Sequence, residues 1–228
     1  MKNALAGLAL LLAFHALAFS QKLDEKIADR LYESAKVLGE TLNAPDGGIP
    51  KSLLKDAECV AVIPAVKKAA LGIGGQYGRG AVTCRKDKGK GPWGPPSMIG
   101  ITGGSFGLQL GGQSYDIVML LMTPTSVEHL LKDKLTLGGD MAVAAGPKGR
   151  AVSAETSVTL QAEILTYARS RGLFAGISLK GVVLSPDKDA NKNLYGREIP
   201  AKDLLLTGNV DIPVPARKLI DTLTIAGN

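Results

Sequence analysis

The sequence predicts an α+β fold: a largely antiparallel, strongly curved or barrel-like sheet, flanked by an N-terminal amphipathic helix and short C-terminal helices. Three observations lead to this prediction. A helical stripe of apolar residues comes first, glycine-punctuated strand-like runs fill the middle of the chain, and a proline opens another helical stripe near the end. The 28 glycines and 4% aromatic residues suit strands that curve and approach one another closely.

The first twenty residues have the pattern of an export signal. Lys2 precedes an apolar stretch, and small residues at Ala18 and Ser20 offer cleavage positions. A membrane anchor is the alternative, but the stretch is shorter than the roughly 20 residues that a spanning helix needs. We therefore expect a signal peptide at 1–20, a single domain at 21–228, and an exported protein that is periplasmic or secreted.

Apolar residues recur with helical spacing from Leu23 to Leu42, and turn-forming residues from Asn43 to Gly48 end the pattern. From Lys22 onwards the polar positions of this helix carry four basic and five acidic side chains. A helix that lies in a membrane interface has a polar face rich in Lys and Arg, so packing against the core is the favoured role here.

Four strand-like runs follow, separated by turn signals at residues 89–92 and 111–114. Their spacing predicts an antiparallel meander. The runs cover residues 59–63, 66–85, 97–110 and 114–122.

The stretch GIGGQYGRG, residues 72–80, holds five glycines in nine positions. A dinucleotide-binding loop would need a third glycine where Tyr77 stands, and a P-loop would need Lys-Ser/Thr where Ala81-Val82 stands. Because both phosphate-binding patterns fail, the stretch is interpreted as a strand that bends or lets another backbone approach.

The remainder of the chain predicts short elements. Thr125 to Glu128 has the form of a capping box and starts a short helix through Leu131. Strands are expected near residues 135–145, 150–169 and 173–184. Two helices are expected after them, one over Asp187–Tyr195 and one after Pro213 that carries Leu219, Ile220 and Leu223.

The two cysteines, Cys59 and Cys84, stand at the ends of strand-like runs. In an exported protein a disulfide between them is the favoured state, and two buried thiols are the alternative. Two cysteines and one histidine after the signal do not suffice for a Cys/His zinc site, so no metal is expected.

Positive charge is concentrated in residues 51–92, which carry nine bases and three acids, a net charge of +6. A basic cluster beside a tryptophan suits an anionic membrane surface, and a solvated hairpin tip is the alternative. The candidate lipid-binding residues are Lys67, Lys68, Arg79, Arg85, Lys86, Lys88, Lys90 and Trp93.

Five motifs resemble, in their order and distances, those of the SYLF domain family. They are GIGGQYGRGAV, WGPPSMIGITGG, LTLGGDMAVAAGPKGR, SRGLFAGISLKG and NKNLYG, within a resemblance over residues 22 to about 225. The resemblance implies a lipid-binding domain of largely antiparallel α+β fold. It further implies phosphoinositide binding in some eukaryotic members and actin-filament binding in others.

In members of this family the opening helix and nearby basic residues are associated with membrane contact. The matching positions are Lys22, Lys26, Arg30 and Lys36. Trp93 falls on a position of the family pattern, which favours packing at the base of a hairpin over insertion into lipid. We expect anionic phospholipid head groups as the partner of a protein that is peripheral to the membrane, and a protein partner in the cell envelope as the alternative.

An enzymatic function is not expected. His129 has no G-x-S-x-G nucleophile motif to accompany it, and Asp116, Asp140, Glu155 and Glu163 have no spacing that brings them together. No cofactor is expected, because no phosphate-binding loop is present. No nucleic acid is expected either, because the chain contains no recognised binding module and has an export signal.

Overall fold

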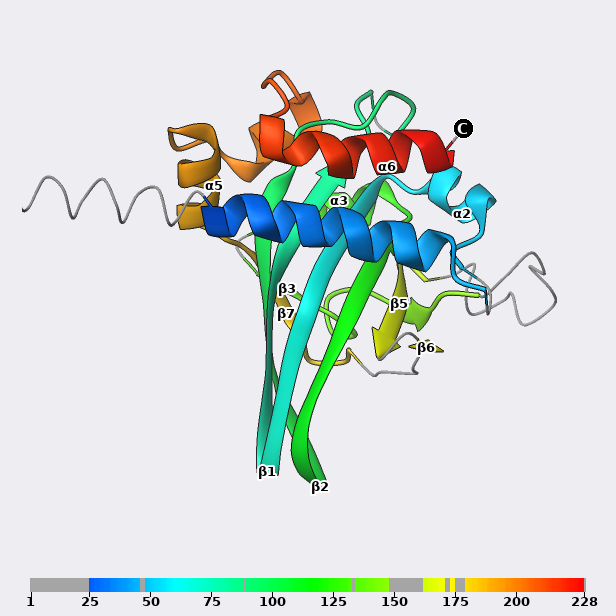
Figure 1. The fold of residues 1–228 in the computed structure, drawn as a ribbon, viewed down its shortest axis with the longest axis vertical. Helices are drawn as coiled ribbons and strands as arrows, with labels where there is room; N and C mark the ends of the chain where they lie inside the picture. The colour runs from blue at the N-terminus through cyan, green and yellow to red at the C-terminus, as the bar shows by residue number, and fades with distance from the viewer. Residues whose placement is uncertain are drawn as a thin grey trace, which may run out of the picture.

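The computed structural model describes residues 25–45, 48–87, 89–132, 134–147, 162–170, 173–174 and 179–227. Its centre is a sheet dominated by two very long strands, with helices crossing one face and short elements packed on the other (Figure 1). The predicted α+β fold with a strongly curved, largely antiparallel sheet is confirmed. The predicted signal segment lies outside the described residues.

The N-terminal helix, residues 25–42, crosses the front of the sheet next to α6 (Arg217–Gly227) (Figure 1). Its apolar stripe is buried: Leu31 and Leu38 are fully inaccessible, and Ile27 and Ala35 nearly so. Core packing is therefore the role of this stripe, as the periodicity predicts. The short α2 (Lys51–Asp56) leads from this helix into the sheet.

The strands β1 (Cys59–Cys84) and β2 (Ser97–Leu121) form an antiparallel ribbon that is folded in half. The first half of β1 pairs with the second half of β2, from Cys59 opposite Leu121 to Ala70 opposite Gly111. The second half of β1 then returns along the first half of β2, ending with Val82 opposite Ser97.

This pairing differs from the expected meander. Residues 66–85 and 97–110 are neighbours as predicted, but residues 59–63 pair with residues 117–121 at the other end of β2. The turn expected at residues 111–114 is extended strand. The physical reason is that the ribbon bends as a unit, so each strand continues through the bend and keeps its partner.

Two glycines of the 72–80 stretch lie where the halves of β1 meet. A Cβ at Gly80 would clash with the carbonyl oxygen of Val62, and one at Gly78 would come within 2.8 Å of methyl groups of Ile63 and Val66. Gly80 needs to be glycine because the backbone of the first half of β1 approaches it closely, and Gly78 because side chains of that half do. The interpretation of this stretch as a bent strand is confirmed.

Five short strands complete the seven-stranded sheet, in the order β3-β7-β2-β5-β4, with β1 on β2 and β6 on β5. Only the β4–β5 pair is parallel among the described strands. Their bounds are β3 Leu135–Thr136, β4 Val143–Ala145, β5 Ile164–Ser170, β6 Leu173–Phe174 and β7 Val183–Pro186.

The strand expected over residues 135–145 is divided by a turn. Gly138 adopts a positive φ of 71°, and the Asp140 carboxylate accepts a 2.7 Å hydrogen bond from the backbone N–H of Thr136. A left-handed glycine followed by an aspartate favours such a turn over a continuous strand. Of the strand expected at 150–169, residues 164–169 belong to β5, and residues 150–161 lie outside the described part of the chain.

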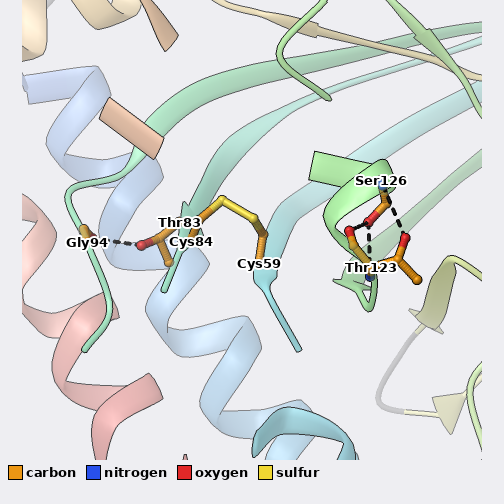
Figure 2. Close-up of a disulfide and its surroundings, with 6 residues drawn as sticks. All are labelled: Cys59, Thr83, Cys84, Gly94, Thr123 and Ser126. Carbon is orange, nitrogen blue, oxygen red and sulfur yellow. Dashed lines mark hydrogen bonds between the residues drawn. A yellow bond between two sulfur atoms is a disulfide. The ribbon is translucent and has the colours of Figure 1, made fainter. Parts of the chain in front are cut away.

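The helix α3 (Pro124–Leu130) begins earlier than predicted. Its capping box joins Thr123 and Ser126, not Thr125 and Glu128 (Figure 2). Proline is favoured in the first turn of a helix, so Pro124 starts it and Thr123 becomes the N-cap. The later helices follow the prediction: α5 (Lys188–Tyr195) is capped by Asp187, and a short 3₁₀ turn after Pro213 precedes α6.

The body of the sheet has a hydrophobic core on each face. Along Cys59–Ile63 and Ile117–Leu121 every residue is buried, so these segments are apolar without alternation. Odd-numbered residues face the core formed with α3, β7 and the π-helical turn Asp203–Thr207, and even-numbered residues face the core formed with the N-terminal helix and α6. Within the described residues no helix combines the length and hydropathy needed to cross a membrane.

Candidate functional site

The candidate basic residues occupy three separate places. Lys67 and Lys68 lie on the first, outgoing half of β1 (59–70), and Arg79 lies on its second, returning half (72–84). Arg85, Lys86 and Lys90 lie in the connection to β2. Lys88 lies outside the described residues. The connection lies beside α6, whereas the bend of the ribbon forms the opposite end of the molecule (Figure 1). The basic segment is therefore continuous in sequence but not in space.

The connection between β1 and β2 is a compact turn. The N–H of Lys86 donates to the carbonyl of Pro92 at 2.9 Å, and that of Gly91 donates to the carbonyl of Lys86 at 2.8 Å. Asp87 and Gly89 both have positive φ, of 54° and 84°. Lys90 is exposed, while the stem of Lys86 packs beside Gly208.

Arg85 and Trp93 hold the base of this turn together. They form a β-bridge, and the Arg85 guanidinium lies 4.2 Å from the centre of the Trp93 ring. Trp93 is only 3% exposed, so packing at the hairpin base, and not insertion into lipid, is its role in this structure. Burial lowers the pKa of Arg85 from its ordinary value, and a cation–π contact offsets part of that desolvation.

The disulfide Cys59–Cys84 closes the two ends of β1 on each other (Figure 2). The Cα atoms lie 3.9 Å apart although the residues are separated by 25 positions. Next to it, the hydroxyl of Thr83 donates to the carbonyl of Gly94 at 2.7 Å and ties the end of β1 to the connection. The predicted disulfide is confirmed.

A cavity of about 480 Å³ opens beside the disulfide. Its lining combines the apolar side chains of Val127, Leu205 and Leu206 with the charged groups of Glu58 and Arg85. The carboxylate of Glu128 also belongs to the lining, so the cavity provides room for an apolar group beside charged groups.

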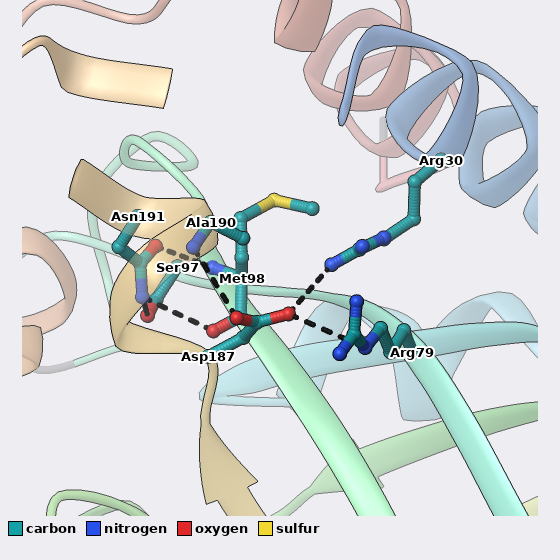
Figure 3. A network of polar contacts seen from close by, with 7 residues as sticks. All are labelled: Arg30, Arg79, Ser97, Met98, Asp187, Ala190 and Asn191. Carbon is teal, nitrogen blue, oxygen red and sulfur yellow. Dashed lines mark hydrogen bonds and ion pairs between the residues drawn. The ribbon is translucent and has the colours of Figure 1, made fainter. Parts of the chain in front are cut away.

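Arg79 belongs to a cluster that joins three elements. The Asp187 carboxylate accepts a 2.9 Å hydrogen bond from Arg30 on the N-terminal helix and lies 3.7 Å from Nε of Arg79 on β1 (Figure 3). Its other oxygen caps α5 through the N–H of Ala190. Lys26 also lines the cavity of about 420 Å³ at this junction.

The sequence identified Arg79 as a candidate residue, but it did not indicate that Arg79 and Arg30 both lie beside the carboxylate of Asp187. These residues are separated by 49 and 108 positions, and no local pattern relates them. The one available signal was the resemblance, which pointed to Lys26 and Arg30 on the opening helix. In the structure both guanidinium groups share one carboxylate, so the cluster retains an excess of positive charge.

The carboxylates considered as catalytic candidates do not converge. The β1–β2 register shifts between Ile63 and Val66, which forms a bulge, and there Asp116 accepts the N–H of Ala65. Asp140 closes the 136–140 turn, and Glu163 accepts the N–H of Ala142. Hydrogen bonds from the backbone and side chain of Thr136 hold the pKa of Asp140 below its ordinary value. Glu155 lies outside the described residues, within which no group of three His, Cys, Asp or Glu side chains could hold a metal ion.

Residues 102–226 match the family model Ysc84, described as "Las17-binding protein actin regulator". Similarity to individual proteins extends further along the chain. "SH3 domain-containing YSC84-like protein 1" of Bos taurus is 38% identical over 197 residues, which is 84% of this chain and 57% of that protein.

Two fungal proteins are similar over a longer stretch. "SH3 domain-containing protein PJ696.02" of Schizosaccharomyces pombe is 37% identical over 207 residues, and "Protein YSC84" of Saccharomyces cerevisiae is 33% identical over 208 residues. Each match covers 90% of this chain, but only 47% and 43% of the respective relative. The chain thus spans about half the length of the curated relatives that it matches.

Proposed function

The chain belongs to the Ysc84, or SYLF, family, and on that premise we propose that it is a non-enzymatic, exported domain that docks reversibly on anionic phospholipid membranes through basic side chains. The observation that carries the proposal is the charge of the two long strands. β1 and β2 contain Lys67, Lys68 and Arg79 but a single acidic residue, Asp116, which is engaged at the bulge by the N–H of Ala65.

Attraction to an anionic surface requires positive charge that is not neutralised locally. Lys67 and Lys90 are exposed, and the described residues contain no ion pair to Lys67, Lys68, Lys86 or Lys90. Each lysine near an anionic membrane contributes about 1 kcal/mol, so a few of them suffice for weak, salt-dependent and reversible binding.

Export is part of the proposal. It rests on the signal-like pattern of residues 1–20 and on the Cys59–Cys84 disulfide, since disulfides persist in oxidising compartments. The head groups that the protein meets would then be those of a membrane facing such a compartment.

Sedimentation with vesicles tests the proposal. We expect the protein to pellet with vesicles of phosphatidylglycerol and phosphatidylcholine at about 50 mM salt, to be released at about 500 mM salt because of screening, and to ignore pure phosphatidylcholine. The absence of binding to anionic vesicles at low salt would refute the proposed function.

Two variants then distinguish the separated basic groups. Replacing Lys67 and Lys68 with Ala should weaken binding by up to about thirtyfold if the ribbon docks, and replacing Lys86, Lys88 and Lys90 should weaken it by up to about a hundredfold if the connection docks. Binding that is unchanged in both variants would show that these lysines do not form the docking surface.

A protein partner is the second candidate function. It is favoured by the description of the matching family as "Las17-binding protein actin regulator". A protein that co-purifies with the chain, together with no binding to vesicles, would support an interaction or scaffold domain in the cell envelope and exclude the lipid proposal.

A further inference from the structure

The cavity of about 480 Å³ beside the disulfide reaches from the surface into the core. Figure 2 shows the disulfide and the start of α3, two of the elements around it. Its inner wall is apolar, because the disulfide, Val127 and Leu205 are each no more than 5% exposed. Leu206 is 43% exposed and Glu128 is also exposed, so these two residues mark its opening. The volume lies within the range of roughly 300–1,000 Å³ that is typical of pockets for small molecules.

Three charged side chains line this cavity, those of Glu58, Arg85 and Glu128. The backbone N–H of Arg85 donates to the carbonyl of Glu58 at 2.8 Å, so these two residues are direct neighbours. Even so, no ion pair joins Arg85 to either carboxylate, and the described residues contain no other ion pair to any of the three. Charged groups that leave water are usually paired, so this separation of opposite charges around one cavity needs an explanation.

The connection between β1 and β2 holds the two neighbouring charges apart. The Arg85 guanidinium lies over the Trp93 ring at 4.2 Å, and its Nη1 donates to the carbonyl of Gly91 at 3.4 Å. The Glu58 carboxylate lies directly beside Gly89, in the space that a side chain at that position would fill. Both groups are therefore positioned before any ligand arrives, which lowers the entropy that binding must overcome.

The chemistry of the lining indicates the class of ligand. An anion alone would face two carboxylates, and a cation alone would face the guanidinium. A phosphate accepts charge-assisted hydrogen bonds from a guanidinium, and a primary ammonium donates them to carboxylates. A phosphoethanolamine head group carries both charges, and an acyl chain attached to it would meet the apolar wall.

We propose that this cavity binds one molecule of a lipid with a phosphoethanolamine head group and a single acyl chain. The phosphate lies at Arg85, the ammonium lies at Glu58 and Glu128, and the chain lies along Val127 and Leu205. One chain is specified because the volume of the cavity is in the lower part of the range for such pockets. The inference goes beyond the proposed function, since it concerns a single lipid molecule inside the fold and not the surface of a bilayer.

Titration calorimetry with lysophosphatidylethanolamine tests the proposal, in the absence of vesicles and below the concentration at which this lipid forms micelles. We expect one molecule to bind per protein chain. The tetradecanoyl lipid should bind about fifteenfold more tightly than the dodecanoyl lipid, because each buried methylene group raises the affinity about fourfold.

The variant E58Q/E128Q removes both carboxylates and keeps the shape of the side chains. It should bind lysophosphatidylethanolamine at least about tenfold more weakly than the natural protein does. Lysophosphatidate lacks the ammonium, so the variant should bind it no more weakly than the natural protein. The matched control E25Q/E33Q removes two exposed carboxylates from the N-terminal helix, outside the cavity lining, and should leave both affinities unchanged.

The variant R85Q tests the position of the phosphate. It should bind both phosphate lipids at least about tenfold more weakly. Because Arg85 also stacks on Trp93, thermal unfolding is measured in parallel, and R85K, which keeps a cation, should bind both lipids more tightly than R85Q does.

Several outcomes would overturn the inference. These are equal affinities of E58Q/E128Q and the natural protein for lysophosphatidylethanolamine, an affinity that does not depend on chain length, and no binding at all. A natural protein that prefers lysophosphatidate would assign the cavity to an anionic lipid and exclude the role given to the carboxylates. None of these measurements involves a bilayer, so their failure leaves the docking proposal standing, and a failure to sediment with vesicles leaves this inference standing.

Discussion

At the scale of single residues, the fold depends on a few positions where backbones come close together. Gly80 is the clearest of them, because the returning half of β1 crosses the outgoing half there, against the backbone of Val62 and Ile63. By contrast, a Cβ at Gly104 on β2 would meet no atom within 4 Å. The same residue type is therefore required at one position and dispensable at the other.

We expect Gly80→Ala to lower the free energy of unfolding by about 3 kcal/mol or more, because the added methyl group must displace the backbone of the neighbouring half. Gly104→Ala, the matched control, should change it by less than about 1 kcal/mol. Urea unfolding followed by circular dichroism measures both. Equal stability of the two variants would contradict the close crossing of the two halves of β1.

At the scale of elements, α5 is fastened to the sheet by one buried amide. Asn191 is 5% exposed, and its side chain accepts a 2.7 Å hydrogen bond from the N–H of Met98 and donates to the carbonyl of Met98 and the hydroxyl of Ser97 at 3.1 Å (Figure 3). The amide thus satisfies the N–H of Met98 and shares the carbonyl of Met98 with the backbone N–H of Asp187.

Replacing Asn191 with Ala should cost about 1–3 kcal/mol, because the buried N–H of Met98 loses its partner, while the carbonyl of Met98 keeps the N–H of Asp187. Lys192→Ala on the same helix is the control and should leave the stability nearly unchanged, since its ion pair with Glu198 is exposed. Hydrogen exchange gives an independent readout, because the amide of Met98 should lose protection only in the Asn191 variant. Protection that stays unchanged would show that α5 is held by other contacts.

At the scale of the whole molecule, the folded ribbon brings the ends of a 26-residue strand together, and the disulfide locks this arrangement. The cross-link restricts the unfolded chain, since any unfolded conformation must keep residues 25 positions apart in contact. Its effect therefore reaches beyond the atoms around it.

Reducing the Cys59–Cys84 bond should lower the free energy of unfolding by about 3 kcal/mol in the loop-entropy description. Urea unfolding with and without reductant measures this, and the C59A/C84A variant, which has no bond to reduce, should not respond to reductant. Mass spectrometry of protein isolated from an oxidising compartment should show the bond and an N-terminus that follows Ala18 or Ser20. Two free thiols in that preparation would contradict the Cys59–Cys84 disulfide.

Several parts of the molecule are determined by local sequence. The apolar stripe of residues 25–42, the cap of α5 at Asp187 and the doubly buried segment Cys59–Ile63 were predictable, because helical period, capping chemistry and continuous apolar runs act over a few residues. The capping box of α3 was predicted two residues late, because Pro124 fixes the first turn more strongly than Glu128 does.

The tertiary structure alone decided where the functional side chains lie. The sequence determined that residues 51–92 are basic and that the glycine-rich strand bends, since composition and backbone freedom are local properties. It did not determine that Lys67 lies on the folded ribbon apart from Lys90 in the connection, or that Arg30 and Arg79 share Asp187. Those placements follow from the folding of the ribbon in half and from packing between segments far apart in the chain, and no local pattern encodes such long-range pairing.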